Sequence, residues 1–420
     1  MLSEEVQAGR INDKPLQKDA INADATQSSW IAGKCMLTVK GSNRLWGPWE
    51  GKHQVVEFQL APKESRDVSL IIKPVPSEVT VELADLMRDP EDADIIVRSP
   101  RDYQVFQRHS LNAGPVLISG RSNVDCDSLR ATISGTSLNE KEFSKTIDVN
   151  LDPETHAFTY STDDFPAGGW YELKMEAVDD GKVVASQTVE HFGVGEVFVG
   201  AGQSNSTNSG QFKIEQTSNM VSSFSGTDWR IANDPQPGTH DRSGGGSYYP
   251  ALGDLLYEKY KVPIGFAVTG HGGTSVNQWQ PGDELHSWMM TRIHQLGPRG
   301  FRAVLWHQGE SDVGMTTEEY YGKMKTIIVG SKQQAGWEFP WFVAQVSYHN
   351  PDKPSHETTR NAHAKLWADG VAMQGPDTDT LVGDDRDFDG KGIHFSPKGL
   401  KAHGKMWFEH LTPWLDRILK

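Results

Sequence analysis

Residues 197–205 read Val-Phe-Val-Gly-Ala-Gly-Gln-Ser-Asn, and this stretch decides the fold. The apolar, β-branched run at its start predicts a buried strand, and the small residues after it predict a sharp turn of the backbone. Ser204 is the first side chain beyond that turn able to act as a nucleophile. Because open α/β sheets bind their ligands at the carboxyl ends of parallel strands, the stretch points to a serine-based site. A surface loop rich in Gly, Ser and Asn is the alternative interpretation.

Strand-like and helix-like segments alternate after Gly193, which predicts a parallel sheet with right-handed crossovers. The last helix has Ser396 as its N-cap and Pro397 at its first position. Thr316 and Glu319 form a candidate capping box for an earlier helix. We expect strands at 197–199, 263–268, 303–306, 341–346 and 380–382, and helices at 249–260, 284–296, 317–332 and 356–368.

Residues 30–193 show a different pattern, in which short strands are separated by turn residues. The clearest hairpin lies within 171–184, where apolar and polar residues alternate and Asp179-Asp180-Gly181 supplies the turn. This pattern predicts an immunoglobulin-like β-sandwich, built as one β unit or two. The chain is thus divided into a flexible lead-in (1–29), a β-sandwich region (30–193) and an α/β domain (194–420). Other strands are expected at 55–58, 68–72, 116–120 and 129–134.

The composition of the chain argues against some classes of binding partner. The 420 residues carry a net charge of −15, which argues against nucleic acid and anionic membranes as partners. No apolar window approaches the length of a membrane span, and the polar first 29 residues lack the apolar core of a signal peptide. Cys35 and Cys126 lack metal-site spacing, and no H-x-E or C-x-x-C pattern occurs, so neither a metal nor a cofactor is expected. We expect two free thiols, with a disulfide as the alternative.

Four polar segments fall at the carboxyl ends of expected strands, at 202–205, 270–275, 307–312 and 387–395. A serine hydroxyl needs a base, and His394 stands where its ring would reach the same sheet edge. Acyl transfer also needs donors for the developing oxyanion. Gly272 and Gly273 offer unobstructed backbone amides, and Gln308 offers a side-chain amide.

The combined motifs resemble the sialate O-acetylesterase-type carbohydrate esterases of the SGNH/GDSL hydrolase superfamily. They are residues 202–205, residues 272–274 with Trp279 following, residues 308–312, and a late histidine. The resemblance covers about residues 194–415. It implies a flavodoxin-like three-layer α/β/α fold, a nucleophilic Ser204, His394 as its base, and a secreted or periplasmic location. Oxyanion donors would be the Ser204 amide, Gly272 and Gln308.

One position departs from that pattern. The superfamily places the triad acid two or three residues before the histidine, where this chain has Gly392 and Lys391. We rank Asp389 first as the acid, because the flanking glycines would let it fold back toward His394. Asp387 is an alternative, and an acid-free dyad is another.

Substrate contacts are expected from Trp279, Asn205, Gly273 and Glu310. Trp229 and residues 244–246 are further candidates for the wall of a sugar cleft. Core packing is the alternative for the tryptophans, and Glu310 and Asp312 have an alternative role in holding their loop by hydrogen bonds.

The sequence therefore predicts a serine esterase that removes O-acetyl groups from a carbohydrate through an acetyl-serine intermediate. Acetylated polysaccharides and sialic acid both remain open as substrates. The alternatives are a non-catalytic carbohydrate-binding protein and an acyltransferase on the same scaffold.

Overall fold

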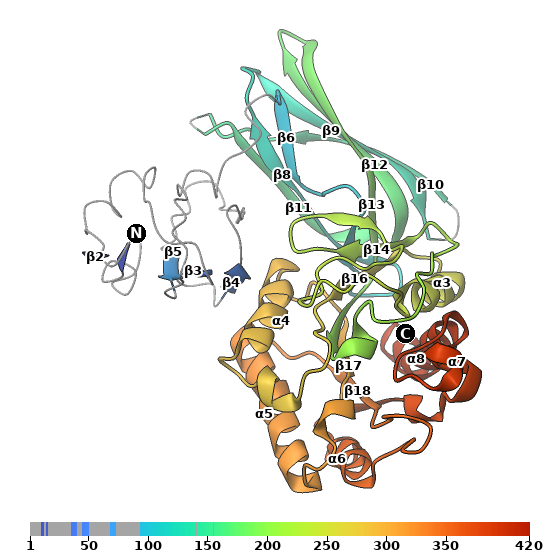
Figure 1. Ribbon diagram of the computed structural model, residues 1–420. Helices are drawn as coiled ribbons and strands as arrows, with labels where there is room; N and C mark the ends of the chain where they lie inside the picture. Colours follow the sequence, from blue (N-terminus) through green and yellow to red (C-terminus); the bar gives the residue numbers. More distant parts are fainter. Residues whose placement is uncertain are drawn as a thin grey trace.

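The computed structural model describes residues 93–138, 141–153 and 155–420, and the backbone of five earlier strands (Figure 1). Three of these strands form an antiparallel sheet in the order β4-β3-β5. The strand expected at 68–72 is present as β5, and the one expected at 55–58 lies outside the described residues. The five strands are β1 (Arg10–Ile11), β2 (Lys14–Pro15), β3 (Cys35–Val39), β4 (Arg44–Trp49) and β5 (Val68–Ile72).

Two antiparallel sheets pack face to face in the β region. One sheet has the order β11-β8-β6, and the other runs β10-β9-β12-β13. Both contribute side chains to one core, including Ile118 and Phe158 from the first sheet and Ile133 and Leu173 from the second. The strands are β6 (Ile95–Ser99), β7 (Gln104–Gln107), β8 (Ala113–Ser122), β9 (Ser128–Ser137), β10 (Lys141–Val149), β11 (Ala157–Pro166), β12 (Gly168–Asp179) and β13 (Lys182–Gly202).

The predicted hairpin is formed by β12 and β13, joined by the two-residue turn Asp180-Gly181. Both turn residues have positive φ, 46° and 74°, as a type I′ turn requires. β13 then continues past the β region. Its register is antiparallel with β12 as far as Val194 and parallel with β16 from Glu196 onward. One strand therefore belongs to both halves of the molecule.

The C-terminal half has a parallel sheet in the order β14-β16-β13-β17-β18-β19, with β15 antiparallel on β14. β13 lies between β16 and β17, so the chain continues to one side of β13 and then crosses to the other. Such a switch point is where open α/β sheets bind ligands. The strands are β14 (Val221–Phe224), β15 (Trp229–Ile231), β16 (Ile264–Val268), β17 (Ala303–His307), β18 (Trp341–Gln345) and β19 (Met373–Asp377).

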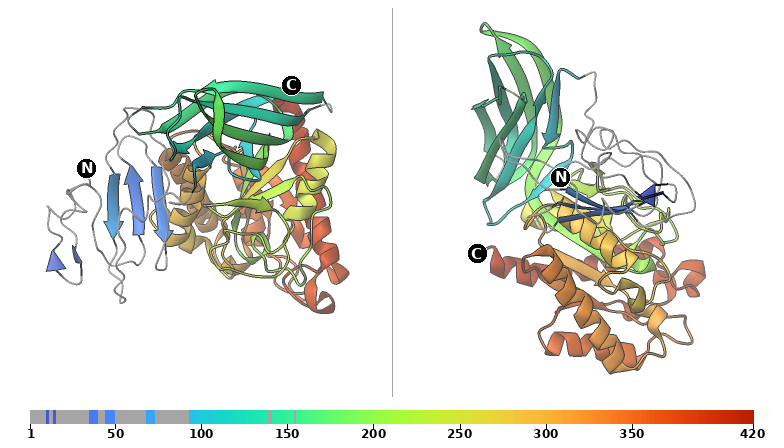
Figure 2. Two further views of the ribbon diagram at one scale, coloured as in Figure 1. Left: turned by 90° about the horizontal axis from the view of Figure 1, so that it is seen from above. Right: turned by 90° about the vertical axis from the view of Figure 1, so that its left-hand side faces the viewer.

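Helices cover both faces of this sheet (Figures 1 and 2). Alternate side chains of β13 enter different cores: Phe198 packs with α3 and α8, whereas Val197 and Val199 pack with α4, α5 and α6. This confirms the expected α/β class. The helices are α3 (Tyr249–Tyr260), α4 (Glu284–Gln295), α5 (Thr317–Ala335), α6 (Glu357–Ala368), the short α7 (Asp387–Gly390) and α8 (Pro397–Ile418).

Helix starts follow the predicted caps. The Thr316 side chain accepts a hydrogen bond from the Glu319 amide, and the Ser396 side chain accepts one from Gly399. The strand expected at 380–382 is wrong, because the last strand is β19, which ends at Asp377. Among the described strands β19 pairs only with β18. It contains Gly375 and Pro376, which an edge strand tolerates and which break the apolar run expected of a buried strand.

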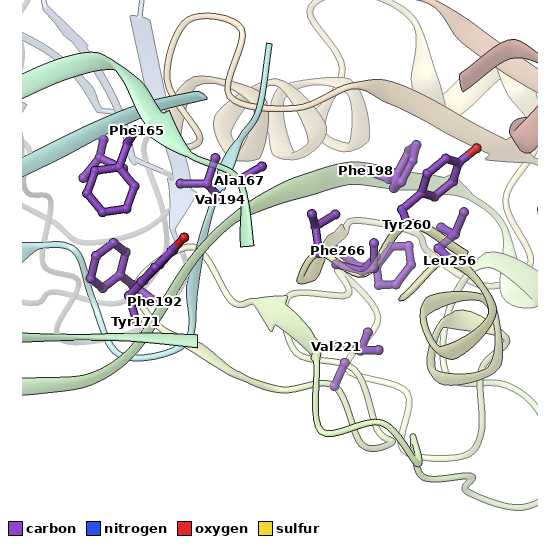
Figure 3. Close-up of a cluster of buried hydrophobic side chains, with 14 of the residues drawn as sticks. Phe165, Ala167, Tyr171, Phe192, Val194, Phe198, Val221, Leu256, Tyr260 and Phe266 are labelled. Carbon is purple, nitrogen blue, oxygen red and sulfur yellow. The ribbon is translucent and has the colours of Figure 1, made fainter. Parts of the chain in front are cut away.

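The junction between the two halves is closed by packing and by charge. Figure 3 shows one continuous cluster, from Phe165, Tyr171 and Phe192 in the β region to Phe198 and Phe266 in the parallel sheet. Beside it lies a fully buried carboxylate, Glu196, on β13. Its oxygens accept hydrogen bonds from Arg108 Nε and Arg302 Nε, both at 2.7 Å. Burial alone would raise the pKa of Glu196, but the two guanidinium groups hold it below its usual value.

Candidate active site

Ser204 lies directly after β13, at the start of a 3-10 turn, Ser204–Ser206. The turn before it needs glycine: a side-chain carbon at Gly202 would lie 2.1 Å from the His307 carbonyl oxygen, and the φ of Gly202 is 126°. The Ser204 residue is only 7% exposed. Its backbone amide is at the amino-terminal end of the turn, where a helical segment leaves its first N–H groups without internal partners.

His394 precedes α8 and lies beside Asp387. Its Nδ1 atom is 3.6 Å from Asp387 Oδ2, and its backbone amide donates to Asp387 Oδ1 at 3.2 Å. The 3.6 Å separation is an ion-pair distance, longer than a hydrogen bond. Burial lowers the pKa of His394 below its usual value, against an opposing effect of Asp387. Burial therefore favours the neutral imidazole, which is the form able to accept a proton.

The choice of Asp389 as the partner of His394 is corrected by this geometry. Asp389 is exposed, whereas Asp387 is buried. Gly392 shows why the acid is displaced along the chain: a side-chain carbon there would lie 1.7 Å from Asp387 Oδ1. The Asp387 carboxylate thus occupies the space that a side chain at position 392, two residues before His394, would need.

Two side chains tie the serine loop to the histidine loop through one carbonyl group. The Ile393 oxygen accepts from Asn205 Nδ2 at 3.2 Å and from Arg386 Nη1 at 2.8 Å. Arg386 is buried and also donates to the Leu381 and Thr378 carbonyls. These bonds fix His394, the next residue, relative to Ser204, the residue before Asn205.

The Gly272 amide, an expected oxyanion donor, faces the site but has a partner. It donates to Asp241 Oδ2 at 2.7 Å. The other Asp241 oxygen accepts from the amide and hydroxyl of Ser243, at 2.9 and 2.7 Å. An ideal Cβ on Gly272 would be 3.5 Å from Ser204 Cβ, so this amide is close to Ser204. An oxyanion has to displace the Asp241 carboxylate in order to use it.

Gln308 does not fit the expected donor role. It is fully buried, and its Nε2 atom lies within hydrogen-bond distance of an Asp312 oxygen, the Thr274 carbonyl and Gln203 Oε1. An amide nitrogen has two hydrogens, so none is left for an oxyanion. Its Oε1 atom accepts from Tyr320 at 2.8 Å. Gln308 therefore holds the loop after β17.

Glu310 and Asn205, both expected to contact substrate, instead contact each other. Asn205 Nδ2 donates to Glu310 Oε1 at 3.0 Å, and the two residues are 5% and 4% exposed. Glu310 Oε2 has no hydrogen-bond partner among the described residues. Burial raises the pKa of Glu310 to about 7, and the Asn205 hydrogen bond opposes this shift. The structure thus supports the alternative for Glu310 and Asp312, because Asp312 also accepts from Ser275 and the Val276 amide.

The tryptophans belong to the core. Trp279 is fully buried, donates to Thr274 Oγ1 at 3.0 Å and packs edge-on against Trp306. Trp229 is buried and stacks on Phe224. The expectation that Trp279 contacts substrate is therefore wrong. Gly273 is exposed next to Gly272, with nothing within 4 Å of an added Cβ, so its position still suits a substrate contact.

Sequence reasoning did not find Asp241 or Arg386. Asp241 lies in the segment His-Asp-Arg-Ser-Gly-Gly-Gly, where nothing distinguishes it from a solvated loop residue. The place of Arg386 next to Asp387 in the sequence could have marked it as part of the site. Its charge did not predict that it would be buried. Within the described residues, no cluster of three or more His, Cys, Asp or Glu side chains is placed to hold a metal ion. No helix there is long and apolar enough to cross a membrane, and Cys126 carries a free thiol.

Comparison with known proteins gives a family match over the C-terminal half. The family described as "Carbohydrate esterase, sialic acid-specific acetylesterase" matches residues 194–412. A probable carbohydrate esterase of Arabidopsis thaliana is 40% identical over 52 residues, which are 12% of this chain and 20% of that protein. Human sialate O-acetylesterase is 26% identical over 136 residues, 25% of this chain and 26% of that protein. The aligned part thus spans only about a fifth to a quarter of these relatives. A crystal structure of an Arabidopsis thaliana protein covers 53% of this chain and 98% of its own, with a TM-score of 0.42 and 17% identity.

Proposed function

Since the chain belongs to the sialic acid-specific acetylesterase family of carbohydrate esterases, we propose that it is a serine esterase that removes O-acetyl groups from a carbohydrate. The pairing of His394 with Asp387, fixed relative to Ser204 through the Ile393 carbonyl, is the observation that carries this proposal. The strand order around β13 suits the SGNH superfamily, in which we place the α/β half.

In this mechanism His394 presents Nδ1 to Asp387, which leaves Nε2 to take the proton of Ser204. Ser204 Oγ attacks the acetyl carbonyl carbon, and the carbon–oxygen bond to the sugar then breaks. The departing sugar oxygen takes the proton from His394. Water, deprotonated by the same imidazole, hydrolyses the acetyl-serine and releases acetate.

Two backbone amides are the proposed oxyanion donors, those of Ser204 and Gly272. The Gly272 amide becomes available when substrate displaces Asp241. Removal of one such donor costs about 100- to 1000-fold in turnover, so this exchange has a direct effect on rate.

The test is Ser204→Ala. It should lower kcat for 4-nitrophenyl acetate by at least about 10⁴-fold, because removing a nucleophilic serine leaves only binding and the oxyanion donors. Its thermal midpoint should match the unmodified protein. Intact mass after treatment with a serine-directed phosphonate should show one adduct, absent in the variant.

Acetate release from a panel of O-acetylated glycans then tests the carbohydrate assignment. Activity that survives in Ser204→Ala would end the covalent mechanism. Turnover of simple acetates with no acetate released from any glycan would contradict the substrate class.

A further inference from the structure

Two phenyl rings project into solvent next to the histidine loop. Phe388 is 69% exposed and Phe212 is 60% exposed. They are the aromatic members of the exposed large hydrophobic side chains among the described residues; the others are aliphatic. Single exposed apolar side chains are common on protein surfaces, whereas exposed apolar side chains on neighbouring segments can mark a binding surface.

The backbone places the two segments that carry these rings on opposite sides of residues 394–396. Arg386 and Phe395 face each other in an isolated antiparallel bridge. The two hydrogen bonds of this bridge lie on either side of the pair. One runs from the Asp387 amide to the His394 carbonyl, and the other from the Ser396 amide to the Asp385 carbonyl. In such a bridge the carbonyl of Phe395 points away from Arg386. That carbonyl accepts from the Gln211 amide at 3.0 Å, on the other side. Phe388 follows Asp387 on one flank, and Phe212 follows Gln211 on the other.

Phe388 is held there in an unfavourable backbone conformation. Its φ is 49° and that of Asp389 is 55°, in the left-handed region that bulky side chains avoid. An edge of its ring is close to Gly392, where an added Cβ would lie 2.9 Å from Phe388 Cδ2. An exposed aromatic ring held in a strained backbone is expected at a functional position rather than in a solvated turn.

Phe212 has a fixed backbone as well. An added Cβ on Gly246 would lie 2.0 Å from the Phe212 carbonyl oxygen, so the two backbones are in close contact. Gly210, two residues earlier, exchanges hydrogen bonds with Gly246 in both directions. The ring is thus mounted on a braced loop, which lowers the conformational entropy lost when a ligand covers it.

We propose that Phe212 and Phe388 form an aromatic surface that binds two sugar units, one on each side of the acetylated position. A pyranose ring has an apolar C–H face and a polar rim, and a phenyl face is complementary to the former. Two rings carried by segments on opposite sides of residues 394–396 favour a substrate with neighbouring sugar units. The inference rests on the proposed esterase function and narrows its substrate class to acetylated oligosaccharides and polysaccharides, as distinct from single acetylated sugars.

The experiment compares Phe212→Ala, Phe388→Ala and the double variant on three substrates. These are methyl acetate, acetylated monosaccharides, and acetylated xylo-, manno- and galacturono-oligosaccharides. Each single variant should raise KM for the best oligosaccharide about three- to tenfold, with kcat unchanged, and the double variant should multiply the two effects. Methyl acetate should be hydrolysed as by the unmodified protein, and Phe388→Tyr should keep the unmodified KM.

Val382→Ala is the matched control, because this side chain is 48% exposed and lies six residues before Phe388 but is aliphatic. It should leave all constants unchanged. Equal KM values for the unmodified and double variants on the best oligosaccharide would overturn the proposal, as would equal kcat/KM of the unmodified protein for mono- and oligosaccharides.

Failure of the esterase function itself would appear differently, as no turnover of methyl acetate or any glycan. In that case calorimetry tests the aromatic surface without turnover. It measures the binding of the acetylated oligosaccharides to Ser204→Ala, with and without Phe212→Ala and Phe388→Ala. Binding that weakens when the rings are removed supports the surface, and binding that does not respond overturns it.

Discussion

Two buried glutamates have opposite environments. Glu196 lies at the junction of the two halves, and Glu310 lies at the candidate site. Both oxygens of Glu196 accept hydrogen bonds, Oε1 from Arg108 and Oε2 from Arg302 and Gln107. Glu310 accepts from Asn205 with one oxygen, and its second oxygen has no hydrogen-bond partner among the described residues. The difference separates a carboxylate that joins structural elements in its charged form from one whose protonated form is favoured by burial.

The pKa shifts of the two carboxylates make opposite contributions to stability. The pKa of Glu196 is lowered in the folded state, so its contribution is present above the unfolded value of 4.5 and is lost as the pH falls through the folded value. The pKa of Glu310 is raised from 4.5 to about 7, so ionisation opposes folding, increasingly as the pH rises through this interval. The shift corresponds to about 3 kcal/mol. Ionised Glu196 therefore stabilises the fold at the junction, whereas ionised Glu310 destabilises it at the candidate site.

After Ser204→Ala, the largest expected effect is on activity, from Asp387→Asn. The amide cannot stabilise a positively charged His394, so kcat for 4-nitrophenyl acetate should fall by about 10³- to 10⁴-fold. Asp389→Asn, the exposed neighbour, is the control and should change kcat less than twofold.

The pH profile adds a second readout for the same pair. The acid limb of kcat/KM should lie below pH 6.5, because burial lowers the pKa of His394, and in Asp387→Asn it should move lower still. A greater loss in Asp389→Asn than in Asp387→Asn would contradict the assignment.

The second expected effect is on stability and tests the comparison of glutamates directly. Glu196→Gln leaves Arg108 and Arg302 buried without a counter-charge and should lower the free energy of unfolding by about 3–5 kcal/mol. Glu310→Gln keeps an acceptor for Asn205 and removes a costly charge, so stability at pH 8 should be unchanged or higher. Urea unfolding at pH 8 measures both. Equal destabilisation by the two variants would remove the distinction.

The smallest expected effect comes from Asp241→Ala. Removing the carboxylate frees the Gly272 amide, and 1.4 kcal/mol of released hydrogen-bond energy corresponds to about a tenfold rise in kcat/KM for methyl acetate. Ser243→Ala is the matched control, because it loosens the same loop while Asp241 still holds Gly272. A tenfold fall in Asp241→Ala would mean that Asp241 takes part in the reaction.

The sequence by itself determined the order of elements and the residues that follow the strands. Apolar runs, caps and turn residues are local signals, so the limits of α3 agree with the structure, and the turn predicted at 179–181 contains the observed turn Asp180-Gly181. The serine loop after Val199 and the histidine before Pro397 were likewise found from their neighbours in the chain. Sequence did less well where the polar edge strand β19 has no apolar run to mark it.

Only the tertiary structure decided the partners across those loops. Asp387 and Asp389 look alike in the sequence, and the two left-handed residues 388 and 389 send one carboxylate inward and the other outward. Gln308 loses its expected role because Asp312 and Thr274 use its hydrogens, and Gly272 is held by a loop 31 residues earlier. The physical reason is common to these cases: hydrogen-bond partners and burial are set by distances between chain segments far apart in sequence, which no local pattern records.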